Sequence, residues 1–264
     1  MEYETEYSIN NIVQQDAANY LINMIDHVQP KRILDIGCGS GNVTHKLNLK
    51  YPNAIIDAID PSSKMIHIAK NNYPASKLNF ICQKIEDFTP EYDYDLIFSN
   101  SSFQWWERHD IALSRIADLL APNGVVAIQT PYRDLWCEEI IILVEQVFNT
   151  HFPELYQNFK FPCLHLETRE QFQDLLLHSG LTPSTIKAHS FTYNVTSEEL
   201  FKIFKSGAVK VYTSSDNFDV EVPKYFQTDF LKKFKSLISN DNVQSTLSLH
   251  RMLLFCCHSP QTED

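Results

Sequence analysis

Five short apolar segments alternate with helix-like segments in the first half of the chain. The segments between them have the apolar spacing of helices. Strands that are apolar on both faces and alternate with helices are typical of a parallel sheet built from βαβ units. The pattern therefore predicts an α/β fold. The apolar segments lie at 32–37, 54–60, 78–83, 95–100 and 124–130, and the helix-like segments at 42–50, 62–72 and 111–120.

Weaker patterns extend this core on both sides. Helical spacing also occurs at 11–27, 135–149 and 167–181. Two more apolar segments, TIKAHSFTY at 185–193 and TLSLHRMLLFCCH at 246–258, have the composition of strands. We therefore predict a seven-stranded, mostly parallel sheet with helices on both faces.

Three regions are predicted along the chain. Residues 1–30 form an N-terminal helical segment, and residues 31–193 together with 245–258 form the sheet domain. Residues 194–244 differ in character, because they contain seven lysines and two helical patterns separated by a polar stretch. We predict that this insertion is a small, mainly helical cap over the edge of the sheet where open α/β sheets bind ligands.

Composition limits the compartment and the partners. No apolar run reaches the ~18 residues of a membrane-spanning helix, and the start, MEYETEYSIN, lacks the basic residues and apolar core of a secretory signal. We expect a cytoplasmic protein that does not enter a membrane. A formal charge of −11 would repel nucleic acid, and the histidines and cysteines show no metal-ligand spacing. Neither nucleic acid nor a metal ion is predicted.

The first predicted strand ends in a glycine-rich turn within ILDIGCGSG. Glycine adopts left-handed backbone angles and lets a ligand approach the main chain. The spacing of Gly37, Gly39 and Gly41 is one residue shorter than the GxGxxG motif that holds a dinucleotide pyrophosphate. No Lys-Ser or Lys-Thr pair follows, so a phosphate-binding loop does not fit either. The turn favours a nucleoside ligand that has no phosphates to bind.

The second predicted strand ends in Asp60, nineteen residues after Gly41. A carboxylate at this place can accept hydrogen bonds from both hydroxyls of a ribose. Asp60 could instead cap the helix that begins within PSSKM. Combined with the glycine turn, the ribose role is favoured, and the predicted ligand is adenosine-like.

Four motifs in this order resemble those of the class I S-adenosylmethionine-dependent methyltransferases. They are LDIGCGSG, the acidic strand end at Asp60, IEDF at 85–88 and LLAPNGVVAIQT at 119–130. The resemblance is close over 33–130 and loose elsewhere. It implies a Rossmann-like methyltransferase sheet, the cofactor S-adenosylmethionine, and an enzyme that transfers a methyl group.

The resemblance also implies a set of cofactor contacts. Gly37 and Gly39 would lie against the methionine moiety, Asp35 near its amino group, and Ile85 and Glu86 beside the adenine. The complete implied set is Gln14, Asp35, Gly37, Gly39, Gly41, Asp60, Pro61, Ile85, Glu86, Ser99 and Asn100.

One position departs from the pattern of the resembled family. Lys84 stands where that family often has an aspartate that contacts the adenine amine. An ammonium group cannot accept a hydrogen bond from an amine. We expect Gln83, Glu86 or a backbone carbonyl to make this contact, or packing to hold the adenine.

The stretch FSNSSFQWWERHD carries the clearest indication of the methyl acceptor. Ser99 and Asn100 should face the cofactor, whereas Gln104, Trp105 and Trp106 should wall the site, with core packing expected for at least one tryptophan. The SNxxxQW arrangement resembles two groups of methyltransferases, which act on malonyl-acyl carrier protein in biotin biosynthesis and on trans-aconitate. Both groups methylate carboxylates, so the resemblance implies carboxyl O-methylation.

Three further segments resemble the malonyl-carrier group. They are YSINNIVQQDAANYL, with the spacing of Tyr7 and Gln14 seen in a first helix that closes over the cofactor, FKSGA at 204–208, and LSLHRMLLF at 247–255. The trans-aconitate group has a similar last strand that contains an arginine. The malonyl-carrier reading is therefore favoured over the trans-aconitate reading.

Methyl transfer from a sulfonium depends on alignment more than on a base, and a carboxylate is already ionised at pH 7. The site should therefore present cations and hydrogen-bonding groups to an acid. Arg133 and Arg251 could hold the acid, or could be surface ion-pair partners. The complete set of positioning candidates is Tyr7, Gln104, Trp105, Arg133, His250 and Arg251.

The sequence leaves alternatives open for the partner of the chain and for the reaction. The lysines of 194–244 could dock an acidic acyl carrier protein, or could belong to the solvated faces of two helices. The reaction could instead be methylation of nitrogen, carbon or a phenol in another small molecule. A third hypothesis is a cofactor-binding protein that acts through a partner without catalysis, and a dinucleotide-dependent oxidoreductase is a more distant one.

Overall fold

The chain forms two compact units in the computed structural model. The model describes residues 2–74, 77–131, 136–164, 166–239 and 245–258, and for residues 2–12 and 258 it describes the backbone alone. The sheet unit comprises Gln14–Tyr132, Leu166–His189 and Arg251–Asp264, and the helical unit comprises Met1–Val13, Arg133–His165 and Ser190–His250.

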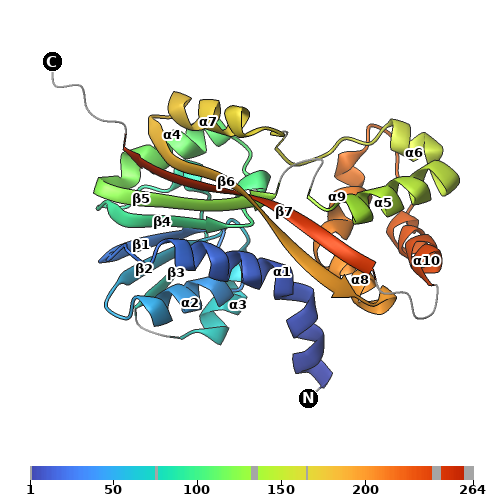
Figure 1. Cartoon of the computed structure of the whole chain (residues 1–264), viewed down its shortest axis with the longest axis horizontal. Coiled ribbons are helices and arrows are strands. Elements are labelled where there is room, and N and C mark those ends of the chain that lie inside the picture. Colours follow the sequence, from blue (N-terminus) through green and yellow to red (C-terminus); the bar gives the residue numbers. More distant parts are fainter. Residues whose placement is uncertain (1, 75–76, 132–135, 165, 240–244, 259–264) are drawn as a thin grey trace. The chain divides into compact units, whose positions relative to one another are not determined.

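Seven strands form one sheet in the order β3-β2-β1-β4-β5-β7-β6 (Figure 1). Strands β1 to β5 pair in parallel, and β7 pairs antiparallel with β5. The predicted fold class, a seven-stranded and mostly parallel sheet, is confirmed. The strands are β1 (Arg32–Ile36), β2 (Ile55–Ile59), β3 (Leu78–Ile81), β4 (Tyr94–Asn100), β5 (Leu120–Pro131), β6 (Leu181–Val195) and β7 (Ser245–His258).

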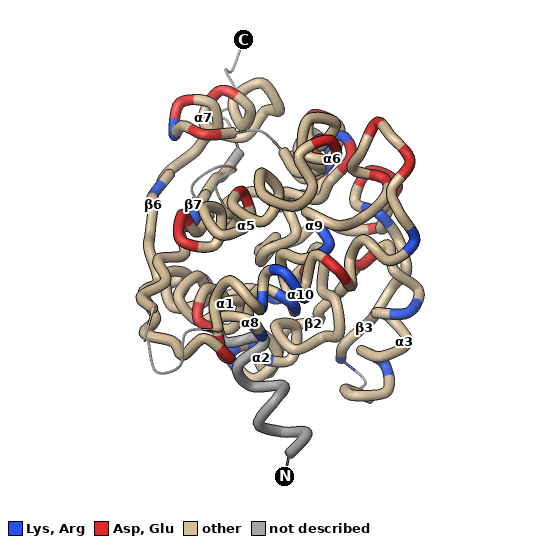
Figure 2. The backbone as a smooth tube through the Cα atoms, turned by 90° about the vertical axis from the view of Figure 1, so that its right-hand side faces the viewer, with Lys and Arg blue, Asp and Glu red and all other residues tan. Residues whose placement is uncertain are grey.

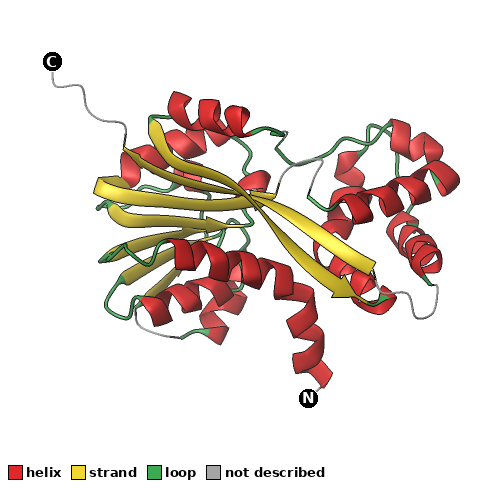
Figure 3. Cartoon of the chain, in the orientation of Figure 1, coloured by secondary structure: helices red, strands yellow, loops and turns green. Residues whose placement is uncertain are grey.

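Helices cover both faces of the parallel strands. Figure 3 shows the helices around the sheet, and Figure 1 places α1, α2 and α3 on one face and α4 and α7 on the other. On the first face, Leu21 of α1 and Ile25, which directly follows this helix, share one core with Ile33, Ile56 and Phe98. The helices are α1 (Glu2–Met24), α2 (Asn42–Lys50), α3 (Ser63–Asn72), α4 (His109–Leu119) and α7 (Arg169–His178), with two short 3-10 turns, η1 (Ile85–Asp87) and η2 (Phe103–Trp105).

The helical unit has a core rich in phenylalanine. The ring of Phe148 in α5 lies 4.8 Å from that of Tyr156, 6.2 Å from that of Phe226 and 4.9 Å from that of Phe230. No helix in the described part of the chain has the length and apolar character needed to span a bilayer. The helices are α5 (Glu138–His151), α6 (Pro153–Gln157), α8 (Ser197–Ile203), the π-helix η3 (Phe204–Ala208), α9 (Val209–Thr213), η4 (Ser215–Asn217) and α10 (Phe226–Ile238).

The compact units have different boundaries from the predicted regions. The predicted cap began at residue 194, but the helical unit also includes Arg133–His165, because the aromatic side chains of α5 and α6 pack with α10. The predicted N-terminal segment ended at residue 30, but most of it belongs to the sheet unit, because Leu21 and Ile25 pack on the sheet. That the helical unit caps the ligand edge stays a prediction.

Candidate functional site

The glycine turn joins β1 to α2 at the carboxyl edge of the sheet. Gly37, Gly39 and Gly41 have φ angles of 75°, 54° and 84°, which are left-handed. The amides of Gly37 and Cys38 donate to the carbonyl oxygen of Ile59 at 2.8 and 3.0 Å, so the turn is anchored on the end of β2. A Cβ atom on Gly39 would meet nothing within 4 Å. The backbone at Gly39 is therefore open to a ligand.

Gly37 is needed for a different reason. A Cβ atom there would lie 2.2 Å from the Cβ of Ser102. The Ser102 hydroxyl donates to the carbonyl oxygen of Ile36 at 2.9 Å, and it lies 2.7 Å from Ser99 Oγ. The loop after β4 thus packs directly on the turn after β1. These two strands flank the point where the sheet order reverses, which is where open α/β sheets bind ligands.

Asp60 follows β2 and joins two loops. Its Oδ2 accepts a hydrogen bond from the Gly39 amide at 3.0 Å, and its Oδ1 accepts one from the Ser62 amide at 2.8 Å. Ser62 is the residue that caps α3, because its hydroxyl accepts from the Met65 amide. The alternative that Asp60 caps this helix is therefore wrong. Each carboxylate oxygen keeps a second lone pair, so Asp60 can still accept from two hydroxyls.

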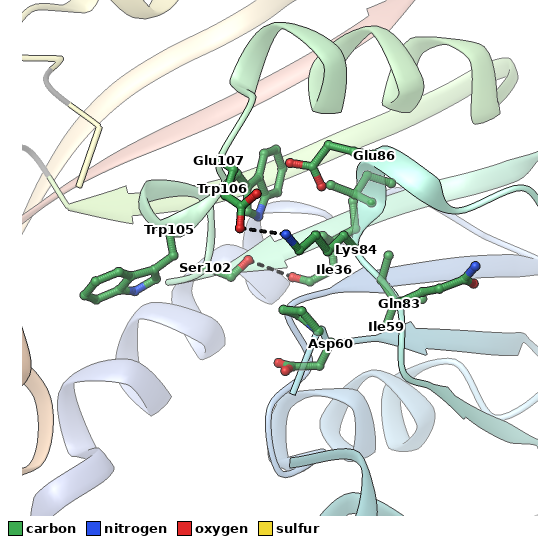
Figure 4. A pocket seen from close by; sticks show the side chains of 13 residues that line it. Ile36, Ile59, Asp60, Gln83, Lys84, Glu86, Ser102, Trp105, Trp106 and Glu107 are labelled. Atoms are coloured by element: carbon green, nitrogen blue, oxygen red, sulfur yellow. Dashed lines mark hydrogen bonds and ion pairs between the residues drawn. The ribbon is translucent and has the colours of Figure 1, made fainter. Parts of the chain in front are cut away.

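A pocket lies beside Asp60, formed by the ends of β1 and β2 and by the loops after β3 and β4 (Figure 4). The isoleucine side chains form apolar walls, and Asp60 and Glu86 add carboxylates. Five of the predicted cofactor residues line it, namely Gly37, Asp60, Pro61, Ile85 and Glu86. The other lining residues are Ile36, Ile59, Gln83, Lys84, Ser102, Trp105, Trp106 and Glu107.

Lys84 and Glu107 form an ion pair in the lining of this pocket. Lys84 Nζ lies 2.6 Å from Glu107 Oε1 (Figure 4), and this hydrogen bond raises the pKa of Lys84. Their side chains are 42% and 71% exposed, so solvent screens the pair and its contribution to stability is small. Gln83 and Glu86 line the same pocket and provide the hydrogen-bond acceptors that Lys84 lacks.

Asp35 does not line the pocket. It is 2% exposed, and its Oδ2 accepts a hydrogen bond from Thr44 Oγ1 at 2.6 Å. Burial raises the pKa of Asp35 from its ordinary 3.8 to about 7; the bond from Thr44 opposes this shift and the charge of Asp60 adds to it. Asp35 in the cofactor-free protein is therefore close to half protonated near neutral pH.

The raised pKa of Asp35 predicts a pH-dependent stability. Below pH ~4 the carboxyl is protonated in both the folded and the unfolded chain. Between pH ~4 and ~7 the unfolded chain ionises it while the folded chain keeps the proton, so the free energy of unfolding should fall by up to about 4 kcal/mol and then stay level. Urea unfolding of the cofactor-free protein, followed by circular dichroism at several pH values, measures this fall.

The matched variant is Asp35→Asn, which has no proton to lose and keeps an acceptor for Thr44. It should show a clearly shallower fall over the same pH range. An Asp35→Asn slope equal to that of the unmodified chain would show that another group is responsible.

The remaining predicted residues of the loop after β4 have defined partners. Gln104 Nε2 donates to the carbonyl oxygen of Ser101 at 3.1 Å, and Gln104 Oε1 accepts from Thr130 Oγ1 at 3.3 Å. Trp105 is 49% exposed, and Trp106 packs on Phe103 with a ring distance of 4.9 Å. Gln104 therefore holds the loop to β5, while both tryptophans line the pocket.

Several other predicted contacts do not line the pocket. Ser99 is fully buried, and the carbonyl oxygen of Gln14 accepts from Asn100 Nδ2 at 3.2 Å. His250 belongs to the helical unit, where its Nδ1 lies 2.7 Å from Ser190 Oγ. The remaining ones are Gly39, Gly41 and Arg251, which belong to the sheet unit, and Arg133 and the side chain of Tyr7, which lie outside the described residues.

The sequence reading did not select Ser102 or Glu107 for the pocket. Ser102 packs against Gly37, but the two residues are 65 positions apart and nothing in the local sequence connects them. Glu107 is an exposed acid in a charged stretch, and it has no distinguishing pattern.

The fold and the glycine turn define the class of protein to which the chain is similar. Residues 33–124 match a family model described as a methyltransferase domain. The structure resembles Burkholderia thailandensis 1,6-didemethyltoxoflavin-N1-methyltransferase, solved with 1,6-didemethyltoxoflavin and S-adenosylhomocysteine, with a TM-score of 0.53 and 13% identity over 93% of this chain and 78% of that one. The chain carries a class I S-adenosylmethionine-dependent methyltransferase domain, and the predicted class and its cofactor are confirmed.

Two groups of relatives are similar to the chain in sequence. It is 38% identical over 121 residues to the malonyl-[acyl-carrier protein] O-methyltransferase of Priestia megaterium. The aligned residues cover 45% of this chain and 44% of the relative. It is 40% identical over 115 residues to the trans-aconitate 2-methyltransferase of Escherichia coli O1:K1 / APEC, and the aligned residues cover 44% of each chain. The chain thus spans less than half the length of both relatives.

Proposed function

We propose that this cytoplasmic protein is an S-adenosylmethionine-dependent methyltransferase that methylates a carboxylate oxygen. The acceptor is malonyl-acyl carrier protein or a small acid such as trans-aconitate. The observation that carries the proposal is the pairing of Asp60 with the open Gly39 backbone at the edge of an apolar pocket. The similarity to two groups of carboxylate methyltransferases supports the acceptor class.

Different residues of the chain would bind the ribose, the methionine moiety and the adenine of such a cofactor. Asp60 has lone pairs for the two ribose hydroxyls, and Gly39 leaves room for the methionine moiety. Ile59 and Ile85 offer apolar walls to an adenine, with Glu86 as acceptor for its amine. When bound, S-adenosylmethionine supplies an electrophilic methyl group. The chain then has to align an ionised carboxylate with that methyl group and exclude water.

The reaction needs no general base at neutral pH. The cofactor would supply both the methyl group and the leaving sulfur, so the chain would only have to hold a carboxylate oxygen of the acceptor in line with them. No proton leaves the acceptor, because a carboxylic acid is already ionised at pH 7. The positioning groups are therefore hydrogen-bond donors and cations, for which Gln104 and Arg251 remain candidates.

The charge of the helical unit bears on the choice of acceptor. Residues 194–244 contain seven lysines and also seven Asp and Glu residues, so their formal charge is zero. The lysines of α10 are visible in Figure 2, but Lys232 lies 3.7 Å from Asp229 and Lys235 lies 3.4 Å from Glu198. An acidic acyl carrier protein would meet no net basic segment here, which favours a small acid as acceptor.

The direct test is methyl transfer from labelled S-adenosylmethionine to malonyl-acyl carrier protein and to trans-aconitate, with an amine and a phenol panel in parallel. We expect a base-labile methyl ester, formed on an acid. Methylation of an amine or phenol without any ester would support the other methyltransferase hypothesis. Tight binding of S-adenosylhomocysteine without turnover on any acceptor would support a non-catalytic binding protein.

A further inference from the structure

Lys84 brings a positive charge to the pocket beside Asp60. Among the lining residues that the structure describes, it is the one with a cationic side chain, whereas Asp60, Glu86 and Glu107 are acids. Lys84 lies in the loop after β3 and Glu107 in the loop after β4, and Figure 4 shows the two side chains directed toward each other. The ammonium group of Lys84 is therefore held between two loops that line the pocket.

The ammonium group of Lys84 has more donors than its partner uses. An ammonium group carries three N–H donors. In the described part of the chain, Glu107 Oε1 accepts from Lys84 Nζ at 2.6 Å. This bond, together with the charges of nearby carboxylates, raises the pKa of Lys84, so the group stays protonated at neutral pH. Two N–H donors are thus left for a ligand or for solvent.

An adenine offers acceptors that match these donors. Its amine donates hydrogen bonds, whereas its ring nitrogens only accept them. Glu86 is proposed above to accept from the amine, and an ionised carboxylate cannot donate to a ring nitrogen. Lys84 stands two residues before Glu86 in the same loop, and both residues line the pocket. An ammonium group beside a carboxylate is complementary to an adenine edge, where a ring nitrogen lies beside the amine.

We propose that Lys84 donates a hydrogen bond to the adenine ring nitrogen beside the amine, and that Glu107 is the positioning residue that orients the ammonium group. The nitrogen is the one at position 1 or 7 of the purine. This inference rests on the proposed placement of the cofactor. It gives a function to the position where the chain departs from the resembled family. The pair of Lys84 and Glu86 selects adenine, because guanine and hypoxanthine carry a carbonyl oxygen in place of the amine.

Replacing single ring nitrogens tests the hydrogen bond directly. In the 1-deaza and 7-deaza analogues of S-adenosylhomocysteine, a C–H group replaces one nitrogen and the net charge at neutral pH is unchanged. The unmodified protein should bind one of the two analogues about tenfold more weakly than S-adenosylhomocysteine. Lys84→Met should bind S-adenosylhomocysteine about tenfold more weakly, and it should bind that analogue equally well, because the donor is gone. Isothermal titration calorimetry measures these affinities.

The control is Lys77→Met, the same chemical change directly before β3, at the opposite edge of the sheet. It should leave all three affinities unchanged. If Lys84→Met discriminates between S-adenosylhomocysteine and both analogues as the unmodified protein does, the inference is overturned. No methyl acceptor is present in this measurement, so that result would leave the proposed cofactor and reaction standing.

Glu107→Gln tests the positioning role separately. It keeps an acceptor for the ammonium group but removes the charge, so the binding of S-adenosylhomocysteine should weaken by about threefold. The same substitution should have no effect when Lys84 is replaced by methionine. Neither variant should lower the melting temperature by more than about 4 °C, because the ion pair is exposed and screened. Equal weakening with and without Lys84 would show that Glu107 acts on the cofactor directly, and would overturn the positioning role.

Discussion

Asp60→Ala should weaken the binding of S-adenosylhomocysteine by about 100-fold or more. A hydrogen bond to a charged group contributes about 1.5–3 kcal/mol, and Asp60 is proposed to accept one from each ribose hydroxyl. The substitution also removes the bond from Asp60 Oδ2 to the Gly39 amide, which holds the turn in place. Isothermal titration calorimetry measures the affinity, and the melting temperature reports any loss of folding.

Two variants make this result specific. Asp60→Asn keeps one acceptor oxygen and the size of the side chain, so a loss of about tenfold is expected. Asp93→Ala removes the same charge from an exposed residue that precedes β4, at the other edge of the sheet, and should leave the affinity unchanged. Wild-type affinity in Asp60→Ala would show that the ribose contact is assigned to the wrong residue.

Gly37→Ala should lower the free energy of unfolding by about 3 kcal/mol or more. An alanine at a φ of 75° costs about 1–2 kcal/mol, and its Cβ would overlap Ser102 at 2.2 Å, where overpacking adds about 1–3 kcal/mol. Because the overlap pushes the loop after β4 away from the turn, the affinity for S-adenosylhomocysteine should fall as well. Urea unfolding and calorimetry measure the two effects.

Gly180 provides the matched control for Gly37. It has a φ of 81°, and a Cβ there would meet its nearest atom, Ala117 Cβ, at 3.9 Å, so Gly180→Ala reports the backbone cost without an overlap. Adding Ser102→Gly to Gly37→Ala should restore part of the lost stability, because it removes the atoms that clash. If Gly37→Ala costs no more than Gly180→Ala, the close packing of Ser102 on Gly37 is wrong.

Local patterns were sufficient for the strands and the cofactor turn. Each strand is a short apolar run because parallel strands are buried on both faces, and each bend after a strand needs residues with particular backbone angles. Gly37, Gly39 and Gly41 all have left-handed backbone angles in the structure. Glycine is the residue that adopts such angles most readily, so the turn can be recognised from the sequence. Asp60 was identified from its spacing to that turn, and the structure added that Ser62 caps the next helix.

Local sequence patterns do not predict the hydrogen-bond partners of the buried carboxylates. Asp35 and Asp57 stand at similar places in β1 and β2, and both are 2% exposed. Asp57 accepts hydrogen bonds from Tyr92 and Tyr94 at 2.8 and 2.6 Å, whereas Asp35 has the Thr44 hydroxyl. The tyrosines follow Asp57 by 35 and 37 residues, so no spacing rule connects them to it. The surroundings of Asp57 therefore depend on how the fold places the segment around Tyr92 and Tyr94 beside β2.

The sequence by itself determined the α/β sheet, the class of cofactor and the residue proposed to hold the ribose, because helix and strand periods and glycine backbone angles are local properties. Only the tertiary structure decided that Ser102 packs on Gly37 and that Lys84 pairs with Glu107. Ser102 and Gly37 are 65 residues apart and meet because β4 pairs with β1. Such meetings depend on which strands become neighbours, and that is a property of the whole folded chain.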